Sequence, residues 1–151
     1  MQWKIIDKNT KFKIDRTWWE REGLNYRLFL WDQLCPECKE QIPTHVGTQE
    51  VDWIDPMTAE VRKTDAIFQC LESLCARKPD YIHSGLPLTT AIFRVLVLNQ
   101  NRPMSAQELS EYIPWKSPEL ILAALRAAQY QLGIFPEWAV SEEDESLSMA
   151  A

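Results

Sequence analysis

Residues 86–135, LPLTTAIFRVLVLNQNRPMSAQELSEYIPWKSPELILAALRAAQYQLGIF, are the stretch that decides the fold of this chain. Apolar side chains recur there every three or four residues in three segments, which predicts three helices. The helices are expected over residues 88–99 and 106–113, and from residue 118 to Gly133. Three helices joined by tight turns are the pattern of a helix-turn-helix unit.

The turns in this stretch carry residues that begin and end helices. Ser105 is expected to cap the second helix, and Glu108 three residues later completes a capping box. Ser117 is expected to cap the third helix, with Pro118 at the first helical position, where a missing N–H loses no hydrogen bond. Gly133 suits the left-handed conformation that ends many helices.

The segment LTTAIFRVLVLNQNRPMSAQELSEYIPW resembles the winged-helix effector domain of two-component response regulators. In that family a Leu-Thr start leads into the first helix, an Asn-x-x-Arg turn follows, and a capped Glu-Leu helix ends near a Trp. The later segment LRAAQYQLG is similar to the end of the family's recognition helix. The resemblance implies a winged-helix-like module over residues 86–138 that binds double-stranded DNA in transcription regulation.

The third helix departs from that family in its charge. The family's recognition helix presents several basic side chains to DNA, whereas Arg126 is the single cation among the outward positions Glu119, Ala123, Ala124, Arg126, Ala127 and Gln129. The family's C-terminal hairpin, the wing, is also missing. The residues left for phosphate binding at the helix start or for reading a base edge are Lys116, Arg126, Gln129 and Gln107.

The chain is acidic, with a net charge of −6, and its charge is uneven. Residues 1–30 hold seven basic and four acidic side chains, whereas the tail at residues 139–151 holds four acidic and no basic ones. An acidic protein binds nucleic acid poorly, because phosphate contacts supply most of the affinity. The basic N-terminal side chains could add such contacts or form a solvated strand face; they are Lys4, Lys8, Lys11, Lys13 and Arg16.

Four cysteines form two pairs. The motif CPEC at Cys35 and Cys38 places two thiolates on a tight turn, which is the usual half of a zinc knuckle. A structural zinc site takes four ligands, and Cys70 and Cys75 are the candidates for the second pair. Residues 49–65 read as a hairpin between the two pairs, so the region is similar to a zinc ribbon.

The spacing of Cys70 and Cys75 leaves alternatives open. A helix is predicted over residues 65–78, with Asp65 as its N-cap. Residues five apart in an unbroken helix are rotated by about 140°, so the two sulfurs could share one ion only if this helix is interrupted. Otherwise a single cysteine of the pair is a ligand, with His45 or His83 in reserve, or both are small core residues. A redox motif of the glutaredoxin type is disfavoured, because Pro43 stops the long helix which that fold needs after its first cysteine.

Seven tryptophans are many for 151 residues. Trp18, Trp19 and Trp31 fall close together in the sequence, and Trp115 and Trp138 bracket the third helix. They are expected either to fill the core or to form an exposed aromatic surface for a protein partner.

The predicted fold is α+β. A β-rich, zinc-ribbon-like module is expected over residues 1–80, with strands at 2–7 and 11–15 and either a strand or the end of a buried segment at 26–31. The winged-helix-like module follows at 86–138, and then an acidic flexible tail at 139–151. No apolar run approaches the ~20 residues of a membrane span, so we expect a cytoplasmic protein with no membrane contact.

The predicted function is that of a small zinc-binding, DNA-binding transcription regulator. The alternative is a non-enzymatic adaptor that docks on a larger nucleoprotein complex through the same helices. No paired carboxylates, nucleophile motif or phosphate loop is found, so we expect no enzyme activity.

Overall fold

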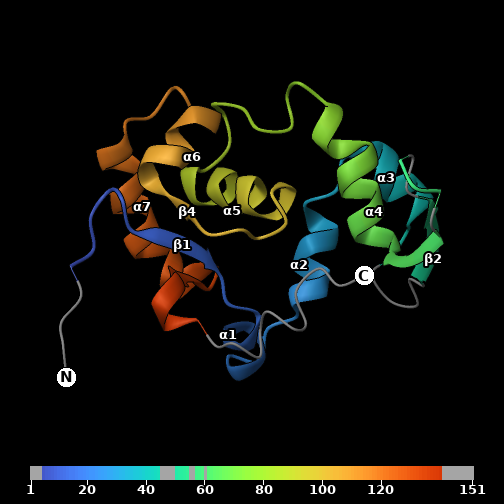
Figure 1. Cartoon of the computed structure of the whole chain (residues 1–151), viewed down its shortest axis with the longest axis horizontal. Coiled ribbons are helices and arrows are strands. Elements are labelled where there is room, and N and C mark those ends of the chain that lie inside the picture. Colours follow the sequence, from blue (N-terminus) through green and yellow to red (C-terminus); the bar gives the residue numbers. More distant parts are fainter. Residues whose placement is uncertain (1–4, 45–49, 55–56, 60, 141–151) are drawn as a thin grey trace. The chain divides into compact units, whose positions relative to one another are not determined.

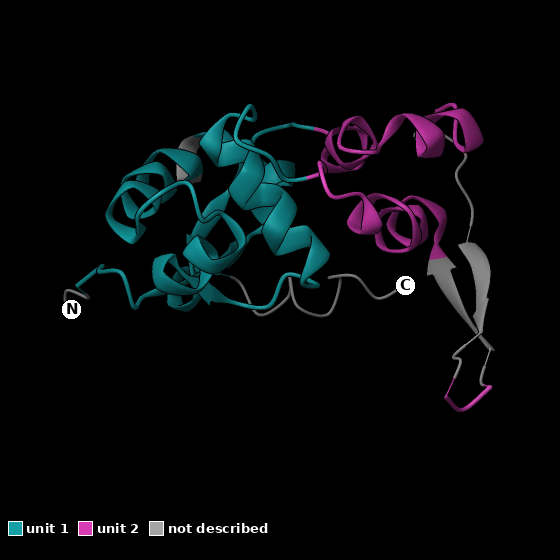
Figure 2. Ribbon diagram, turned by 90° about the horizontal axis from the view of Figure 1, so that it is seen from above, with its two compact units in different colours: residues 1–24, 82–148 teal, residues 25–81, 149–151 magenta. Residues whose placement is uncertain are grey.

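The structure is a computed structural model that describes residues 5–44, 50–54, 57–59 and 61–140. At residues 50–54, 61–64, 129 and 130 it describes the backbone alone. The chain divides into two compact units, which Figure 2 draws in two colours. Unit 1 combines residues 1–24 with residues 82–148, and unit 2 is formed mainly by residues 25–81. The fold contains both helices and antiparallel strands and is α+β.

Unit 1 contains the three predicted helices. They are α5 (Leu88–Leu98), α6 (Ala106–Tyr112) and α7 (Pro118–Gln131). Ser105 caps α6 in a capping box with Glu108, and the Ser117 side chain accepts from the backbone N–H of Leu120 at the start of α7. Gly133 follows α7 with a φ of 66°. Local signals alone were therefore sufficient to place these helices.

A three-stranded antiparallel sheet lies beside these helices (Figure 1). Its strands are β1 (Lys11–Ile14), β4 (Met104–Ser105) and β5 (Ile134–Pro136). The N-terminal strand β1 is in the middle, with Phe12 opposite Met104 on one side and Pro136 on the other. A strand from the start of the chain thus joins two strands that flank α6 and α7.

The core of unit 1 is apolar and closely packed. Helix α1 (Arg16–Arg21) contributes Trp18 and Trp19, both buried, whose rings meet edge to face at 5.5 Å. The indole N–H of Trp19 donates to the carbonyl oxygen of Leu132 at 3.0 Å. The remaining fully buried large side chains include Phe12, Ile14, Ile92, Phe93, Leu96, Leu109, Ile113, Ile121, Leu125 and Ile134.

Unit 2 is mainly helical in its described part. It contains α2 (Tyr26–Asp32), α3 (Pro36–Gln41), α4 (Ala66–Ser73) and a short 3₁₀ helix, η1 (Cys75–Arg77). The predicted hairpin is present as β2 (Glu50–Ile54) and β3 (Val61–Asp65), with Glu50 opposite Asp65 and Ile54 opposite Val61.

Two expectations for the N-terminal half were wrong. Residues 26–31 form helix α2 and not a strand, because Asn25 accepts from the Leu28 N–H as an N-cap and Tyr26 and Leu30 are buried one turn apart. Residues 1–80 are not one β-rich module, because β1 pairs with β4 and β5 in unit 1. Ile5–Asp7 lie outside any strand, and residues 1–4 are outside the described residues.

Within the described ranges, no helix is both long enough and apolar enough to cross a lipid bilayer.

Candidate metal centre

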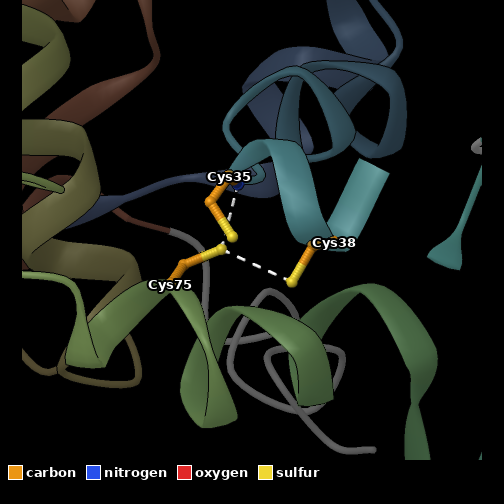
Figure 3. A group of neighbouring side chains, drawn as sticks. All are labelled: Cys35, Cys38 and Cys75. Carbon is orange, nitrogen blue, oxygen red and sulfur yellow. Dashed lines mark hydrogen bonds between the residues drawn. The ribbon is translucent and has the colours of Figure 1, made fainter. Parts of the chain in front are cut away.

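The sulfur atoms of the four cysteines come together in the core of unit 2. The Sγ atoms of Cys35, Cys38 and Cys75 all lie within 4.8 Å of one another. Figure 3 shows these three side chains pointing toward a common centre. Cys70 is bonded to Cys38 in a disulfide, so its sulfur belongs to the same cluster. Cys38 and Cys75 are fully buried, and Cys35 and Cys70 are each 6% exposed.

The first pair is placed by the start of α3. Cys35 is the N-cap residue, Pro36 occupies the first helical position and Cys38 is the third helical residue. Residues three apart lie on the same side of a helix, so both sulfurs face inward. Helix α3 ends at Gln41, shortly before Pro43, which was expected to stop a helix that begins near Cys35.

The second pair is placed by a break in the helix. Helix α4 ends at Ser73, Leu74 is its C-cap, and η1 begins at Cys75. The sequence left open whether the helix is interrupted between the two cysteines, and the structure shows that it is. The break brings both Cys70 and Cys75 to the cluster, which an unbroken helix could not do.

Hydrogen bonds hold the two halves of the centre together. The backbone N–H of Cys35 donates to the Sγ of Cys75 at 3.1 Å, and Cys75 Sγ is 3.6 Å from Cys38 Sγ. The buried hydroxyl of Tyr81 donates to the Gln33 carbonyl oxygen at 2.7 Å, which fixes the chain after η1 to the chain before α3. The N–H···S hydrogen bond from Cys35 to Cys75 stabilises negative charge on the Cys75 sulfur.

Two ion pairs connect the same elements. Lys78 Nζ, just after η1, lies 2.6 Å from Glu37 Oε1 in the first turn of α3. The hydrogen bond to Glu37 raises the pKa of Lys78, and a smaller contribution comes from nearby Cys35. Arg27 of α2 pairs with Asp65, whose side chain caps α4 by accepting from the Ile67 N–H at 2.9 Å. Sequence reasoning missed Lys78 and Arg27, because their acidic partners are 41 and 38 residues away.

No histidine contributes to the cluster among the described residues. His83 is exposed in unit 1, and its Nδ1 accepts from the Gly85 N–H at 3.1 Å. His45 lies outside the described residues. Of the alternatives left open by the sequence, the four cysteines are the set that the fold brings together.

The chemistry of this set is that of thiols. Four cysteine sulfurs offer one structural zinc ion a complete set of ligands when all are thiolates. The same sulfurs form disulfides when oxidised, and in the structure Cys38 and Cys70 are bonded while Cys35 and Cys75 are free.

The residues predicted to contact DNA belong to unit 1. Lys116 precedes α7 and is partly buried, whereas Arg126 is exposed on α7. Gln107 is exposed at the start of α6, and its backbone N–H donates to the Lys8 carbonyl oxygen at 3.2 Å. The side chain of Gln129 lies outside the described residues.

The basic N-terminal side chains differ in their surroundings. Lys11 Nζ lies 2.5 Å from Glu108 Oε1, and Lys8 Nζ lies 3.7 Å from Glu119 Oε1. Lys13 is only 4% exposed. The expectation of a solvated position is therefore wrong for Lys13, whereas the paired side chains of Lys8 and Lys11 are 52% and 48% exposed. Lys4 lies outside the described residues.

The five tryptophans whose side chains the structure describes do not form one exposed surface. Trp18 and Trp19 are buried and Trp31 is partly buried, whereas Trp115 and Trp138 are 37% and 50% exposed. Trp31 donates its indole N–H to the Ile42 carbonyl oxygen at 2.6 Å, and Lys39 Nζ lies 5.2 Å from its ring centre. The first three tryptophans thus stabilise the two units from within.

Comparison of the chain with protein-family models, curated proteins and solved structures finds no match. The assignment of a function therefore rests on the geometry of the two units.

Proposed function

We propose that Cys35, Cys38, Cys70 and Cys75 hold one structural zinc ion in the reduced protein. The observation that carries the proposal is the convergence of four cysteines from two distant segments in one buried cluster. A tetrahedral zinc site with Zn–S bonds of about 2.3 Å has sulfur–sulfur edges of about 3.8 Å. The 3.6 Å between Cys38 and Cys75 is close to that edge.

The size of unit 2 also supports a metal. Domains of about 60 residues or fewer bury little apolar surface, and many depend on metals or disulfides for stability. Unit 2 is formed mainly by residues 25–81, and four of its buried residues are the cysteines themselves. An ion bound by all four would join α3 to α4 and η1, as a zinc-ribbon-like site does.

Metal analysis tests the zinc proposal. Protein purified under reducing conditions without chelator is expected to hold about one zinc ion per chain, bound by four thiolates. Cys38→Ser is expected to reduce that content strongly, while Ser73→Ala, a matched change in the same unit, leaves it intact. A content well below one, with all four thiols free to titrate, would overturn the proposal.

For unit 1 we propose a non-enzymatic docking module with a winged-helix-like arrangement. Helices α5, α6 and α7 follow one another through short turns, and a strand follows the third helix. In the winged-helix effector domains a C-terminal hairpin follows that helix. Here the single strand β5 pairs with β1, which comes from the N-terminal end of the chain.

The outward face of α7 favours a protein partner over DNA. Leu120 is 54% exposed, and Ala123 and Ala127 are exposed on the same face. Tyr112 and Trp115 are also exposed in the segment that leads into α7. Exposed apolar groups of this kind mark protein contact sites more often than phosphate contacts. The chain on this proposal is an adaptor within a larger assembly.

A DNA-binding regulator is the second candidate. Lys116 at the start of α7 and Arg126 form no ion pair among the described side chains, so both are available to phosphate. Against this, Glu119 lies two turns before Arg126 on the same face, and Lys8 and Lys11 are paired with acids. A few phosphate contacts supply little affinity at physiological salt.

Fluorescence anisotropy of mixed-sequence duplex DNA separates the two candidates. The adaptor proposal expects no binding of the zinc-loaded protein even at low salt. Micromolar binding that falls with salt, and that weakens in Lys116→Ala and Arg126→Ala, would overturn it in favour of DNA binding.

The adaptor proposal is tested by comparing substitutions at two exposed leucines. They are Leu120 on α7 and Leu24 after α1, which are 54% and 47% exposed. A protein co-purifying from the source cells is expected to be lost with Leu120→Glu and kept with Leu24→Glu. Equal retention by both variants would exclude α7 as the docking face.

A further inference from the structure

The cysteine cluster offers two arrangements that exclude each other. Cys38 is bonded to Cys70 in the disulfide, and its sulfur is also 3.6 Å from that of Cys75 within the three-sulfur group. A zinc ion needs all four sulfurs as thiolates, whereas the disulfide removes two of them and leaves Cys35 and Cys75. Two thiols are too few for a structural zinc site.

Both arrangements connect the same elements of unit 2. The disulfide joins α3 to α4 over 32 residues, and zinc would join the start of α3 to α4 and η1. Two further connections involve no sulfur, the ion pairs of Lys78 with Glu37 and of Arg27 with Asp65. Exchange of one crosslink for the other therefore does not require unit 2 to unfold.

We propose that the centre is a redox-sensitive zinc site, in which a peroxide converts Cys38 and Cys70 to the disulfide and releases the ion. This inference rests on the proposed zinc site and adds its regulation. Its class of oxidant is a small two-electron peroxide, because the cluster is buried and a protein oxidant could not reach it.

Cys38 and Cys70 are the two sulfurs that the disulfide joins, and their exposure sets which of the two reacts first. Cys70 is 6% exposed and Cys38 fully buried, so hydrogen peroxide oxidises the Cys70 thiolate first, giving a sulfenic acid and one hydroxide. The Cys38 thiolate then attacks the Cys70 sulfur, forming the S–S bond and expelling a second hydroxide. Two electrons pass from the two sulfurs to the peroxide, and two protons from solvent convert both hydroxides to water. The Zn²⁺ ion leaves, and Cys35 and Cys75 take up protons.

The test treats the reduced, zinc-loaded full chain with hydrogen peroxide and follows three quantities. A colorimetric indicator should register release of one zinc ion per chain. Thiols titrated after denaturation should fall from four to two, and the digest should contain a peptide linking Cys38 to Cys70. A reductant with added zinc should restore the four thiols and the bound ion.

Two variants separate the roles of the sulfurs. Cys75→Ser removes a zinc ligand and is expected to weaken zinc binding. The variant protein should still form the Cys38–Cys70 disulfide under peroxide. The Cys70→Ser variant is expected to lose both tight zinc binding and the Cys38–Cys70 disulfide. Zinc retained by disulfide-bonded protein would overturn the inference, and so would release accompanied by a Cys38–Cys75 or a Cys35–Cys38 link.

Failure of this inference is distinguishable from failure of the proposed zinc site. If the reduced protein holds no zinc before peroxide is added, the zinc proposal itself is wrong. If it holds one ion per chain and keeps the ion and four thiols under peroxide, the zinc site stands and the redox inference alone is overturned.

Discussion

The side chain of Asn101 completes the ladder of the N-terminal strand by pairing with the backbone of Ile14. The Ile14 N–H donates to Asn101 Oδ1 at 2.7 Å, and Asn101 Nδ2 donates to the Ile14 carbonyl oxygen at 2.9 Å. Strand β4 pairs only with Lys11 and Phe12, so the amide serves as the partner beyond the end of that strand. Ile14 and Asn101 are both buried, and Asn101 has a φ of 57°.

Removal of this amide is expected to destabilise unit 1. Asn101→Gly keeps the positive φ but leaves the N–H and carbonyl of Ile14 unpaired, which costs about 2–3 kcal/mol of unfolding free energy. Asn101→Ala adds about 1 kcal/mol of backbone strain. Urea denaturation measures both losses. Gln100→Gly is the control, since Gln100 has a φ of 59° and is exposed, and a loss as large as that of Asn101→Gly would contradict the assigned role.

Gly133 and Gly23 form a matched pair for a second prediction. Both have positive φ, 66° and 67°, but a Cβ on Gly133 would lie 2.6 Å from Trp18 Cε3, whereas nothing lies within 4 Å at Gly23. Gly23→Ala is expected to cost about 1 kcal/mol of unfolding free energy, from backbone strain alone. Gly133→Ala should cost about 3 kcal/mol or more, because a ring in the core must move. Equal losses of unfolding free energy in the two variants, measured by thermal or urea unfolding, would show that the Trp18 ring moves aside without cost.

Stability should depend on pH through Glu108. Its hydrogen bond from Lys11, together with that from the Ser105 backbone, lowers the pKa of Glu108 below its ordinary value of 4.5. The stabilisation is therefore complete above about pH 4.5 and is lost as pH falls through the lower, folded-state pKa. Both side chains are nearly half exposed, so solvent screening limits the contribution to about 0.5–1 kcal/mol.

Glu108→Gln isolates this charge, because the amide oxygen can still accept from the Ser105 N–H. Wild type should exceed the variant in unfolding free energy by about 0.5–1 kcal/mol at pH 7, and the gap should close near pH 3. Urea titrations at the two pH values measure it. A gap that stays constant with pH would mean that the ion pair with Lys11 contributes nothing.

Chelation should affect the two units differently. Removal of zinc from the reduced protein is expected to expose the backbone amides of α3 and α4 to hydrogen exchange, because unit 2 then loses its crosslink. The amides of α5 and α7 should keep their protection. The oxidised protein is the control, since its Cys38–Cys70 bond remains and chelator should have no effect. Loss of protection in both units together would show that they do not fold separately.

The sequence by itself determined the three helices of unit 1, their caps, the hairpin and the closeness of Cys35 to Cys38. These features depend on local chemistry, because Ser105, Ser117 and Gly133 act within one turn of their own position. The apolar periodicity of each helix is likewise contained in the segment that forms it.

Only the tertiary structure decided which segments meet. Strand β1 pairs with strands more than 90 residues away in the chain, and no local pattern distinguishes that pairing from a hairpin with its neighbour. The break at Leu74 lets both Cys70 and Cys75 reach the cluster, and no proline or glycine marks it between residues 66 and 78 of the sequence. Lys11 and Lys8 pair with Glu108 and Glu119, and the sequence did not predict these pairs, because charge pairing across elements is set by the fold and not by spacing in the sequence.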